Sequence, residues 1–470
     1  MDVLNDPRLE DAMPIHPQHT DTAPDPQLAP LVGDRWTTEV VPGLPADLEA
    51  HARRLKAFQR KRGVASATDL LRALLAYVLC APSFRRLGAW AVLVDLADLS
   101  DTAWRQRLAK ANLWLLWLLG ELLSVPPPAE LFAAAGHTRI LLIDATTLGQ
   151  PGGTGDDWRL HTAYDLCAGR LCQVALTDRR GGESLDHYHL HAGDIVVADN
   201  GYGYRRSAAT ARAQEADVVL RIWPATFPLE DAAGHAIDVL AWLRREGPRT
   251  RSRSCWCTWE RQHYAVRLLA VKLPPEAVRA ARRRAVRQAQ RKGRVVSTTA
   301  LALAGWVLLI TTLDERSWPD ADVLRLYRAR WQVELVYKRM KSMLDLNQIR
   351  SKQVTSAEAT VRALLVAWAL QETEASAVRQ VLAHLTTLPR GLPATTPVPL
   401  SSWQLTALCL DTLRQQVQGQ WSQARLRACL PRLRRFLVSS PRRRQHQETS
   451  VRVWLDRRPT AGQVPRPAAA

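Results

Sequence analysis

One segment of the chain places a single carboxylate among cations on the same side of an expected helix. At about 100° per residue, an arc of roughly 60° on such a helix holds four polar side chains. They are Tyr327, Arg330, Glu334 and Lys341, with Lys338 just beyond the Tyr327 edge. One acid surrounded by cations suits a metal-bound carboxylate that lies beside a polyanion. The alternative is a solvated helix face with ion pairs four residues apart, such as Glu334–Lys338.

An apolar stripe runs beside this arc and gives the helix a face for packing. Its members are Leu326, Val333, Tyr337, Met340 and Leu344. A helix with this layout packs its stripe into a core and leaves its polar arc at the edge. The carboxylate of Glu334 is therefore expected at the border between core and solvent.

The spacing Y-x2-R-x3-E-x6-K over residues 327–341 is itself specific. It resembles the hallmark of a large branch of bacterial insertion-sequence transposases, whose catalytic core is the DDE, ribonuclease H-like fold. The resemblance implies that Glu334 is the third metal ligand of the site. It also implies that Tyr327, Arg330 and Lys341 hold phosphates of the element's end. Two aspartates should then lie upstream, each at the end of a buried strand.

Two aspartates upstream meet that expectation. Asp144 ends the apolar run 139–144, and Asp199 ends a similar run at 193–199, just before a Gly-rich loop. A continuous apolar run is typical of a strand buried on both faces. Open α/β sheets place their ligands at the carboxyl ends of such strands, so both acids are expected at one edge of a sheet.

Three carboxylates suit the chemistry that the resemblance implies. Transfer of a phosphodiester needs an activated nucleophile and a stabilised leaving oxygen, and two Mg²⁺ ions about 4 Å apart supply both. Such hard cations keep several waters and need only a few oxygen ligands. Asp144, Asp199 and Glu334 would hold the two Mg²⁺ ions, with Mn²⁺ as a substitute. Many relatives have Arg after the second aspartate; this chain has Asn200, which removes a possible phosphate contact without changing a ligand.

Length, charge and cysteine usage favour a multidomain protein with a nucleic-acid partner. A chain of 470 residues exceeds one ordinary core. The net charge of +19 and the pI near 10.3 favour a polyanion, most simply double-stranded DNA. Seven cysteines, an odd number, argue against a secreted disulfide scaffold. The most apolar run, Leu113–Val125, contains Glu121 and is too short to span a bilayer, so we expect a cytoplasmic protein.

The expected fold class is α/β, with a ribonuclease H-like mixed sheet of five strands flanked by helices. A strand-rich inserted domain interrupts the core, and helical regions precede and follow it. The expected regions are a flexible tail at 1–45, a helical DNA-binding region at 46–128, the first part of the catalytic core at 129–222, the inserted domain at 223–300, the second part of the core at 301–350, a C-terminal helical region at 351–440 and a basic tail at 441–470.

Short capped helices are predicted over 46–128. Ser66–Asp69 and Ser100–Thr102 supply helix caps, and Asn112–Ser124 is a Leu- and Trp-rich helix. Several short helices with basic ends suit a DNA-binding domain, although no clean helix-turn-helix can be drawn. The alternative is a plain helical scaffold.

Two further sets of residues are candidates for contact with DNA. The cationic run Arg279–Arg294 includes Arg283 and Arg287, and no acid interrupts it, which favours a DNA contact over a solvated face. Trp306 opens the strand expected at 305–311. In the resembling branch, the matching tryptophan stacks on a base flipped out of the element's end, which is a sound use of an aromatic ring. The alternative for Trp306 is simple core packing.

We therefore expect a DDE transposase that binds the inverted-repeat ends of its element. It would cleave there with Mg²⁺-activated water and transfer the 3′-hydroxyl ends into target DNA, acting as a homodimer in the synaptic complex. One alternative is a catalytically silent DNA-binding relic of such an enzyme, which the three intact carboxylates disfavour. The other is a ribonuclease H-like nuclease or junction resolvase, which leaves the spacing over 327–341 unexplained.

Overall fold

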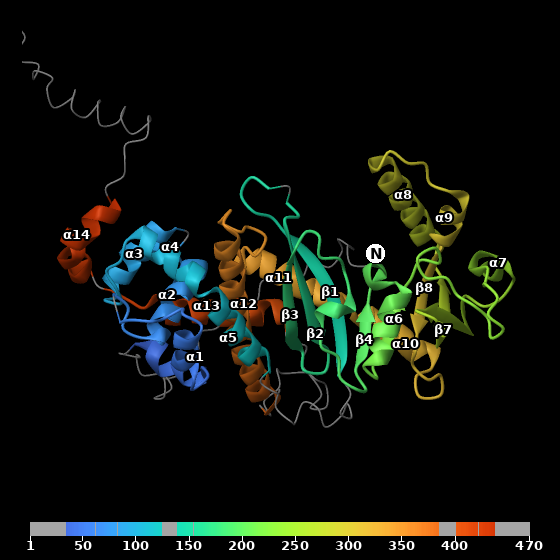
Figure 1. Ribbon diagram of the computed structural model, residues 1–470, viewed down its shortest axis with the longest axis horizontal. Coiled ribbons are helices and arrows are strands. Elements are labelled where there is room, and N and C mark those ends of the chain that lie inside the picture. Colours follow the sequence, from blue (N-terminus) through green and yellow to red (C-terminus); the bar gives the residue numbers. More distant parts are fainter. Residues whose placement is uncertain are drawn as a thin grey trace, which may run out of the picture.

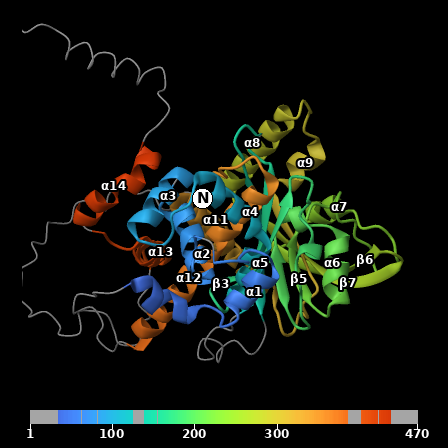
Figure 2. The same cartoon turned by 60° about the vertical axis from the view of Figure 1, so that its left-hand side comes forward.

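The computed structural model describes residues 34–61, 63–81, 83–124, 139–153, 155–384, 401–421 and 423–437. Figure 1 shows a long molecule with N-terminal helices at one end and a central sheet. Two inserted helices, α8 (Pro275–Arg291) and α9 (Thr298–Leu303), lie at the other end. Figure 2, from a second direction, shows the N-terminal helices close to α12 and α13, with the sheet beyond them.

Short helices build the N-terminal region. They are η2 (Trp36–Val40), η3 (Val41–Gly43), α1 (Leu48–Arg54), α2 (Ala67–Leu79), α3 (Phe84–Leu93), α4 (Asp101–Lys110) and α5 (Asn112–Ser124). The predicted caps are confirmed at Ser66 and Ser100, whose hydroxyl oxygens accept hydrogen bonds from the backbone N–H groups of Asp69 and Ala103. Such caps satisfy amide groups that a helix start otherwise leaves without a partner.

Two short helices lie within the region that the sequence predicts to be a flexible tail. Residues 36–43 form η2 and η3, and Trp36 is only 1% exposed in the core. The flexible tail expected at 1–45 is therefore wrong for this last part. Residues 1–33 and the basic tail at 441–470 lie outside the described residues.

One mixed sheet of eight strands forms the centre of the described chain. The strands are β1 (Ile140–Leu148), β2 (Trp158–Asp165), β3 (Arg170–Asp178), β4 (Ile195–Ala198), β5 (Asp217–Arg221), β6 (Thr250–Trp259), β7 (Gln262–Lys272) and β8 (Trp306–Thr311). Their order is β3-β2-β1-β4-β5-β8-β7-β6. The structure does not confirm the expected sheet of five strands: β6 and β7 of the insertion continue the sheet, and β5 adds a further strand between β4 and β8. The antiparallel ladder between β7 and β8 runs from Arg267↔Thr311 to Lys272↔Trp306.

The register of β1 against its two neighbours determines where the first acid lies. The parallel ladder between β1 and β4 ends at Ile143↔Ala198, so the next residues in the two strands are Asp144 and Asp199. Strand β1 does not end at Asp144, as the sequence predicts, because its antiparallel ladder with β2 continues to Leu148. Backbone pairing with β2 therefore continues before and after Asp144 along β1.

Side chains from alternate positions of the central strands pack into two different cores. On β1, Leu142 joins the core that contains the buried side of α11 (Trp331–Leu344), and Ile143 joins the core on the opposite face. Because side chains alternate along a strand, Asp144 faces the same side as Leu142. By the same alternation, Asp199 shares the side of Val197, which also belongs to the first core.

The motif segment 327–341 is divided between two helices instead of one. Helix α10 (Asp320–Ala329) and helix α11 meet at Arg330, whose backbone remains in the right-handed helical region. The backbone N–H of Val333 donates to the carbonyl of Arg330, three residues away, which tightens the first turn of α11. Arg330 therefore stands at the junction, and its side chain need not follow the arc of one straight helix.

The remaining helices pack on the sheet, on the inserted region or on the N-terminal helices. They are η5 (Leu185–His187), η6 (Asn200–Tyr202), α6 (Arg205–Ala213), α7 (Val239–Arg244), α12 (Val354–His384), α13 (Ser402–Gln418) and α14 (Gln423–Leu437). The long helix α12 packs against α5, α2, α4 and α13. In the part of the chain that the structure describes, no helix is both long enough and apolar enough to cross a membrane.

Helix α12 also buries an acid against the sheet. Glu372 is 9% exposed, and its Oε2 accepts a hydrogen bond of 3.2 Å from the backbone N–H of Leu171 on β3. Burial raises the pKa of Glu372 to about 7, although the guanidinium groups of Arg339 and Arg170 oppose the rise. The folded protein therefore keeps a proton on this carboxyl group that the unfolded chain loses near its usual value of 4.5.

We predict that replacing Glu372 by glutamine changes the pH dependence of stability. In the native sequence the folded state binds the extra proton, so the free energy of unfolding falls as pH rises from about 4.5 to about 7, by up to ~3 kcal/mol. Glu372→Gln removes this dependence, so its stability relative to the native protein improves between pH 5 and pH 8 in urea unfolding. Glu374→Gln, an exposed position on the same helix, is the control and should show no such change. If the free energies of unfolding of the native protein and the Glu372→Gln variant change with pH in the same way, the prediction is contradicted.

Candidate active site

Two carboxylates lie side by side where β1 and β4 stop pairing. Asp144 and Asp199 follow the last paired residues of the parallel ladder. Burial raises the pKa of Asp144 to about 7; the Asp199 carboxylate adds to this rise, while the backbone N–H of Ala145 and the side chain of Arg330 oppose it. Two acids that share a half-buried edge disfavour each other's charge. Positive charge nearby would therefore favour the ionised form of both acids.

A chain of hydroxyl groups fixes the backbone beneath Asp144. The hydroxyl group of Tyr337 on α11 donates to the carbonyl oxygen of Asp144 at 2.7 Å and lies 2.7 Å from Thr162 Oγ1 on β2. The hydroxyl group of Tyr188 lies 3.4 Å from the same carbonyl oxygen and 3.0 Å from the hydroxyl group of Tyr202. These buried contacts hold α11 against β1 and β2 at the position of the first acid.

The loop after β4 turns tightly around Asp199. Oδ1 of Asp199 accepts a hydrogen bond of 2.8 Å from the backbone N–H of Gly201. A Cβ atom added at Gly201 would lie 1.4 Å from Oε2 of Glu183, so this carboxylate packs directly on the loop. Glycine at position 201 thus allows a further acid, Glu183, to approach Asp199.

The third acid faces this pair from α11, with one guanidinium group between them. Arg330 Nη2 donates to Glu334 Oε1, and Arg330 Nη1 lies 3.7 Å from Asp144 Oδ2. The guanidinium carbon of Arg330 lies 5.9 Å from the ring centroid of Tyr327. The structure thus brings Tyr327, Arg330 and Glu334 to the two aspartates, with Arg330 as a counter-charge shared by Asp144 and Glu334.

The two lysines of the motif lie in different environments. Lys341 Nζ donates to Thr146 Oγ1 at 2.6 Å, and the charge of the Asp144 carboxylate acts on Lys341. Lys341 is therefore tied to β1 two residues after Asp144. Lys338 is exposed on α11, and no hydrogen bond or ion pair joins it to another described residue.

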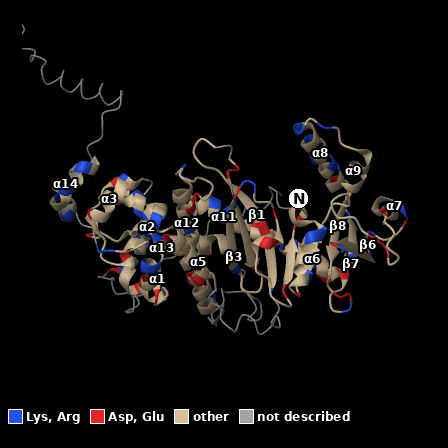
Figure 3. Cartoon of the chain, viewed as in Figure 1, with Lys and Arg blue, Asp and Glu red and all other residues tan. Residues whose placement is uncertain are grey.

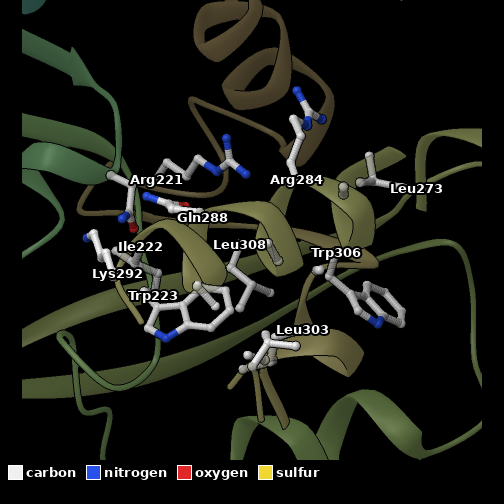
Figure 4. Close-up of a pocket in the computed structure, with 17 residues that line it drawn as sticks. Arg221, Ile222, Trp223, Leu273, Arg284, Gln288, Lys292, Leu303, Trp306 and Leu308 are labelled. Carbon is white, nitrogen blue, oxygen red and sulfur yellow. The ribbon is translucent and has the colours of Figure 1, made fainter. Parts of the chain in front are cut away.

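A pocket of about 620 Å³ separates the loop after Asp199 from the inserted helices (Figure 4). Asn200 lines it on one side, and Arg284, Gln288 and Lys292 of the α8 segment line it on another. Figure 4 shows Trp306 at the end of the pocket opposite Lys292. The pocket therefore extends from the neighbourhood of Asp199 to the basic helix.

The remaining predicted DNA contacts lie away from the three acids. Trp306 is half-buried, and its ring lies 4.9 Å from the guanidinium carbon of Arg251 and 5.9 Å from Lys272 Nζ. Arg283 and Arg287 are exposed on α8, a helix with no buried residue. Figure 3 shows Lys and Arg positions in blue along α8 and also along α14, at opposite ends of the molecule.

Comparisons with known proteins agree with this geometry. Residues 135–370 match the family model described as the transposase DDE domain. The chain belongs to the DDE transposase family. The putative transposase InsL for insertion sequence element IS186A of Escherichia coli strain K12 is 35% identical to it over 342 residues, which are 71% of this chain and 92% of that protein. The transposase for insertion sequence element IS421 of Escherichia coli is 35% identical over 346 residues, with shares of 71% and 92%.

Family membership makes the chain a transposase enzyme with DNA as its partner, and DDE transposases use divalent metal ions. Three carboxylates are hard oxygen donors of the kind that such ions prefer. Burial, with smaller contributions from the Asp199 and Glu334 carboxylates, raises the pKa of Asp144, and a bound cation would favour its ionised form. As the side chains stand, no three His, Cys, Asp or Glu residues of the described chain are close enough to hold one ion together. Glu334 is bound to Arg330, so an ion shared by the three carboxylates would require Glu334 to turn away from that arginine.

Several residues of the transposase site gave no clear signal in the sequence. Tyr337 belongs to the predicted apolar stripe and is buried as expected, but its hydroxyl group also fixes Asp144. Tyr188, Tyr202 and Thr162 come from separate elements that only the folded sheet brings together. Only the approach of Glu183 had a signal in the sequence. The Gly-rich loop after Asp199 indicates that some other group comes close to its backbone.

We predict that Tyr337→Phe destabilises the transposase by about 1–3 kcal/mol, because a buried carbonyl loses its closest hydrogen-bond donor. Urea unfolding measures this change. Tyr264→Phe is the matched control: its hydroxyl group bonds Gln262 at an exposed site, so its loss should cost less than about 0.5 kcal/mol. Equal losses in the two variants would show that the hydroxyl group of Tyr337 does not support the site.

Proposed function

We propose that this transposase cleaves DNA at the inverted-repeat ends of its element and joins the freed 3′-hydroxyl ends to target DNA. The observation that carries the proposal is that Asp144 and Asp199 directly follow the last paired residues of the β1–β4 ladder, with Glu334 on α11 linked to Asp144 through Arg330. In this proposal the three carboxylates hold two Mg²⁺ ions. When bound, the ions supply an activated attacking oxygen and stabilise the leaving oxygen.

The protein's own residues prepare this site in three ways. The hydroxyl group of Tyr337 holds the backbone of Asp144, so the first ligand does not need to be ordered when metal binds. The bond between Asp199 and Gly201 orients the second carboxylate. Arg330 neutralises Asp144 and Glu334 until it exchanges them for a phosphate of the bound DNA, which releases Glu334 for metal.

Cations around the three acids are the proposed phosphate contacts. Arg330 and Lys341 lie closest to Asp144, and Lys338 extends the same side of α11. Arg221 is exposed in the pocket beside Asn200, and its charge acts on Tyr327. Arg221 is thus placed to supply the phosphate contact that an arginine at position 200 would make.

The basic helix α8 is proposed to follow the DNA away from the cut. Arg283 and Arg287 project from a helix that buries none of its residues, and α8 forms one wall of the pocket next to Asn200. A surface of this kind binds phosphates without reading base sequence. We propose a homodimer in the synaptic complex, since two ends of the element must be held together.

We predict that Asp144→Asn, Asp199→Asn and Glu334→Gln each abolish cleavage of end DNA, while binding of that DNA stays within a few-fold of the native protein. These changes keep the shape of each side chain and remove its charge, which prevents a productive two-metal site. Strand cleavage on a labelled end duplex with Mg²⁺ and a mobility-shift assay measure the two quantities.

Glu276→Gln, an exposed acid at the start of α8, is the control and should cleave normally. A residue whose variant retains full cleavage is not a ligand. If the native protein binds the ends but never cleaves them, the chain is a DNA-binding relic and not an active enzyme.

Trp306 is proposed to stack on a base that leaves the duplex near the cut. Its ring lies at the end of the pocket that begins at Asn200, beside Asp199. Arg251 and Lys272 flank the ring, so phosphates on either side of the base would find cations. Stacking of a base on an aromatic ring is worth about 1–3 kcal/mol.

We predict that Trp306→Ala still nicks the first strand but slows the later step, which needs a distorted duplex end, by roughly ten- to a hundred-fold. An abasic site at the flipped position should partly restore that step, because no base then has to leave the stack. Trp256→Ala, an exposed tryptophan on β6 that does not line the pocket, serves as control. If Trp306 only packs, its variant should instead lose folded protein and all activities together.

A further inference from the structure

A second, strongly basic pocket lies between the N-terminal helices and the segment that follows α11. Its volume is about 440 Å³, and no part of the proposed mechanism uses it. Its cations are Arg85 on α3, Arg105 on α4, and Arg350 and Lys352 just before α12. The acid in its lining is Asp101. The pocket therefore has a clear excess of positive charge within a small volume.

Stacked aromatic rings position two of these arginines. Tyr77 and Phe84 stack with their ring centroids 4.4 Å apart. The guanidinium carbon of Arg105 lies 5.7 Å from the Phe84 ring, and that of Arg350 lies 5.8 Å from the Tyr77 ring. Arg350 Nη1 also donates to the carbonyl oxygen of Tyr77 at 3.3 Å. A guanidinium group held in this way can direct its remaining N–H groups at an anion.

The starts of three helices also face this pocket. Ser83 caps α3, Asp101 is the first residue of α4, and Gln353 directly precedes α12; all three line the pocket. Neither α3 nor α12 has an acid in its first turn. Helix N-termini carry a partial positive charge and amide N–H groups that attract phosphate. The helix N-termini and the cations of this pocket thus both favour an anionic ligand such as phosphate.

The pocket continues the edge of the sheet that carries the active site. Lys341 binds Thr146 on β1, and beyond this strand Gly149 forms a parallel bridge with Gln348. Farther along, Lys352 Nζ lies within 3.2 Å of the position that a Cβ atom would take at Gly152. Leu148 is about 13 Å along β1 from Asp144 at the usual rise of a strand. A duplex that is cut at Asp144 and runs along β1 would therefore reach the pocket at least about four base pairs from the cut, at about 3.4 Å per pair.

We propose that this pocket binds backbone phosphates of the element's own end, several base pairs inside the cut. The inference rests on the proposed function and adds a specific contact to it. Because the pocket is shared by the N-terminal helices and the core, one bound phosphate strand links the region expected to bind the end with the region that cleaves it. That geometry favours the end duplex over flanking or target DNA.

The test is the salt dependence of DNA binding by Arg105→Ala and Lys352→Ala, two exposed positions. Fluorescence anisotropy is measured on three DNAs: an end duplex that stops at the cut, the same duplex with flanking DNA, and an unrelated duplex. Each variant should lower the log–log salt slope on the first DNA by about 1, because one phosphate contact is lost.

Lys110→Ala is the matched control, since Lys110 is exposed on the same helix as Arg105 but about 140° around it. Ethylation of the phosphates about four or more pairs from the cut should weaken binding by the native protein and not by the variants.

The outcomes separate this inference from the proposed function. An unchanged slope for both variants on every DNA overturns the inference, whatever the carboxylate variants do. A loss seen only with flanking DNA shows that the phosphates belong to the flank, and an equal loss on the unrelated duplex shows that the pocket has no preference for the end; both overturn the assignment. A loss on the end duplex supports it even if cleavage follows another chemistry.

Discussion

The structure depends on a close approach of two acids at the point where β1 and β4 stop pairing. The parallel register puts Asp144 next to Asp199, and burial together with that neighbour raises the pKa of Asp144 to about 7. An edge of this kind is unfavourable unless a positive charge compensates it. In the chain itself Arg330 provides this charge, and in the proposed mechanism metal ions provide it.

This constraint explains the details around the acids. β1 continues past Asp144 in its ladder with β2, and the hydroxyl group of Tyr337 on α11 bonds the carbonyl oxygen of Asp144. These contacts fix the backbone of Asp144 beside Asp199. The junction of α10 and α11 falls at Arg330, which lets one guanidinium group contact Asp144 and Glu334 together. The same arginine lies beside Tyr327 at the mouth of the site. Exchange of its partners from acids to phosphate would couple DNA binding to metal binding.

The sequence predicted the three acids because each has a strong local pattern, namely an apolar run before Asp144 and Asp199 and a fixed spacing around Glu334. The capped N-terminal helices were also predictable, since Ser66 and Ser100 act within one turn. The eight-stranded sheet was not, because pairing of β7 with β8 depends on a register between distant segments. The hydroxyl groups beneath Asp144 and the basic pocket near Lys352 come from elements far apart in the chain. No local sequence pattern predicts that such distant residues come into contact.

The most direct test of the central claim is the position of metal in crystals of the protein with an end duplex and Mn²⁺, found by anomalous scattering. We expect two peaks about 4 Å apart, contacted by the carboxylates of Asp144, Asp199 and Glu334, with Arg330 turned towards a DNA phosphate. Peaks held by other residues, or a complex in which Arg330 still binds Glu334 and no metal lies beside Asp144, would contradict it.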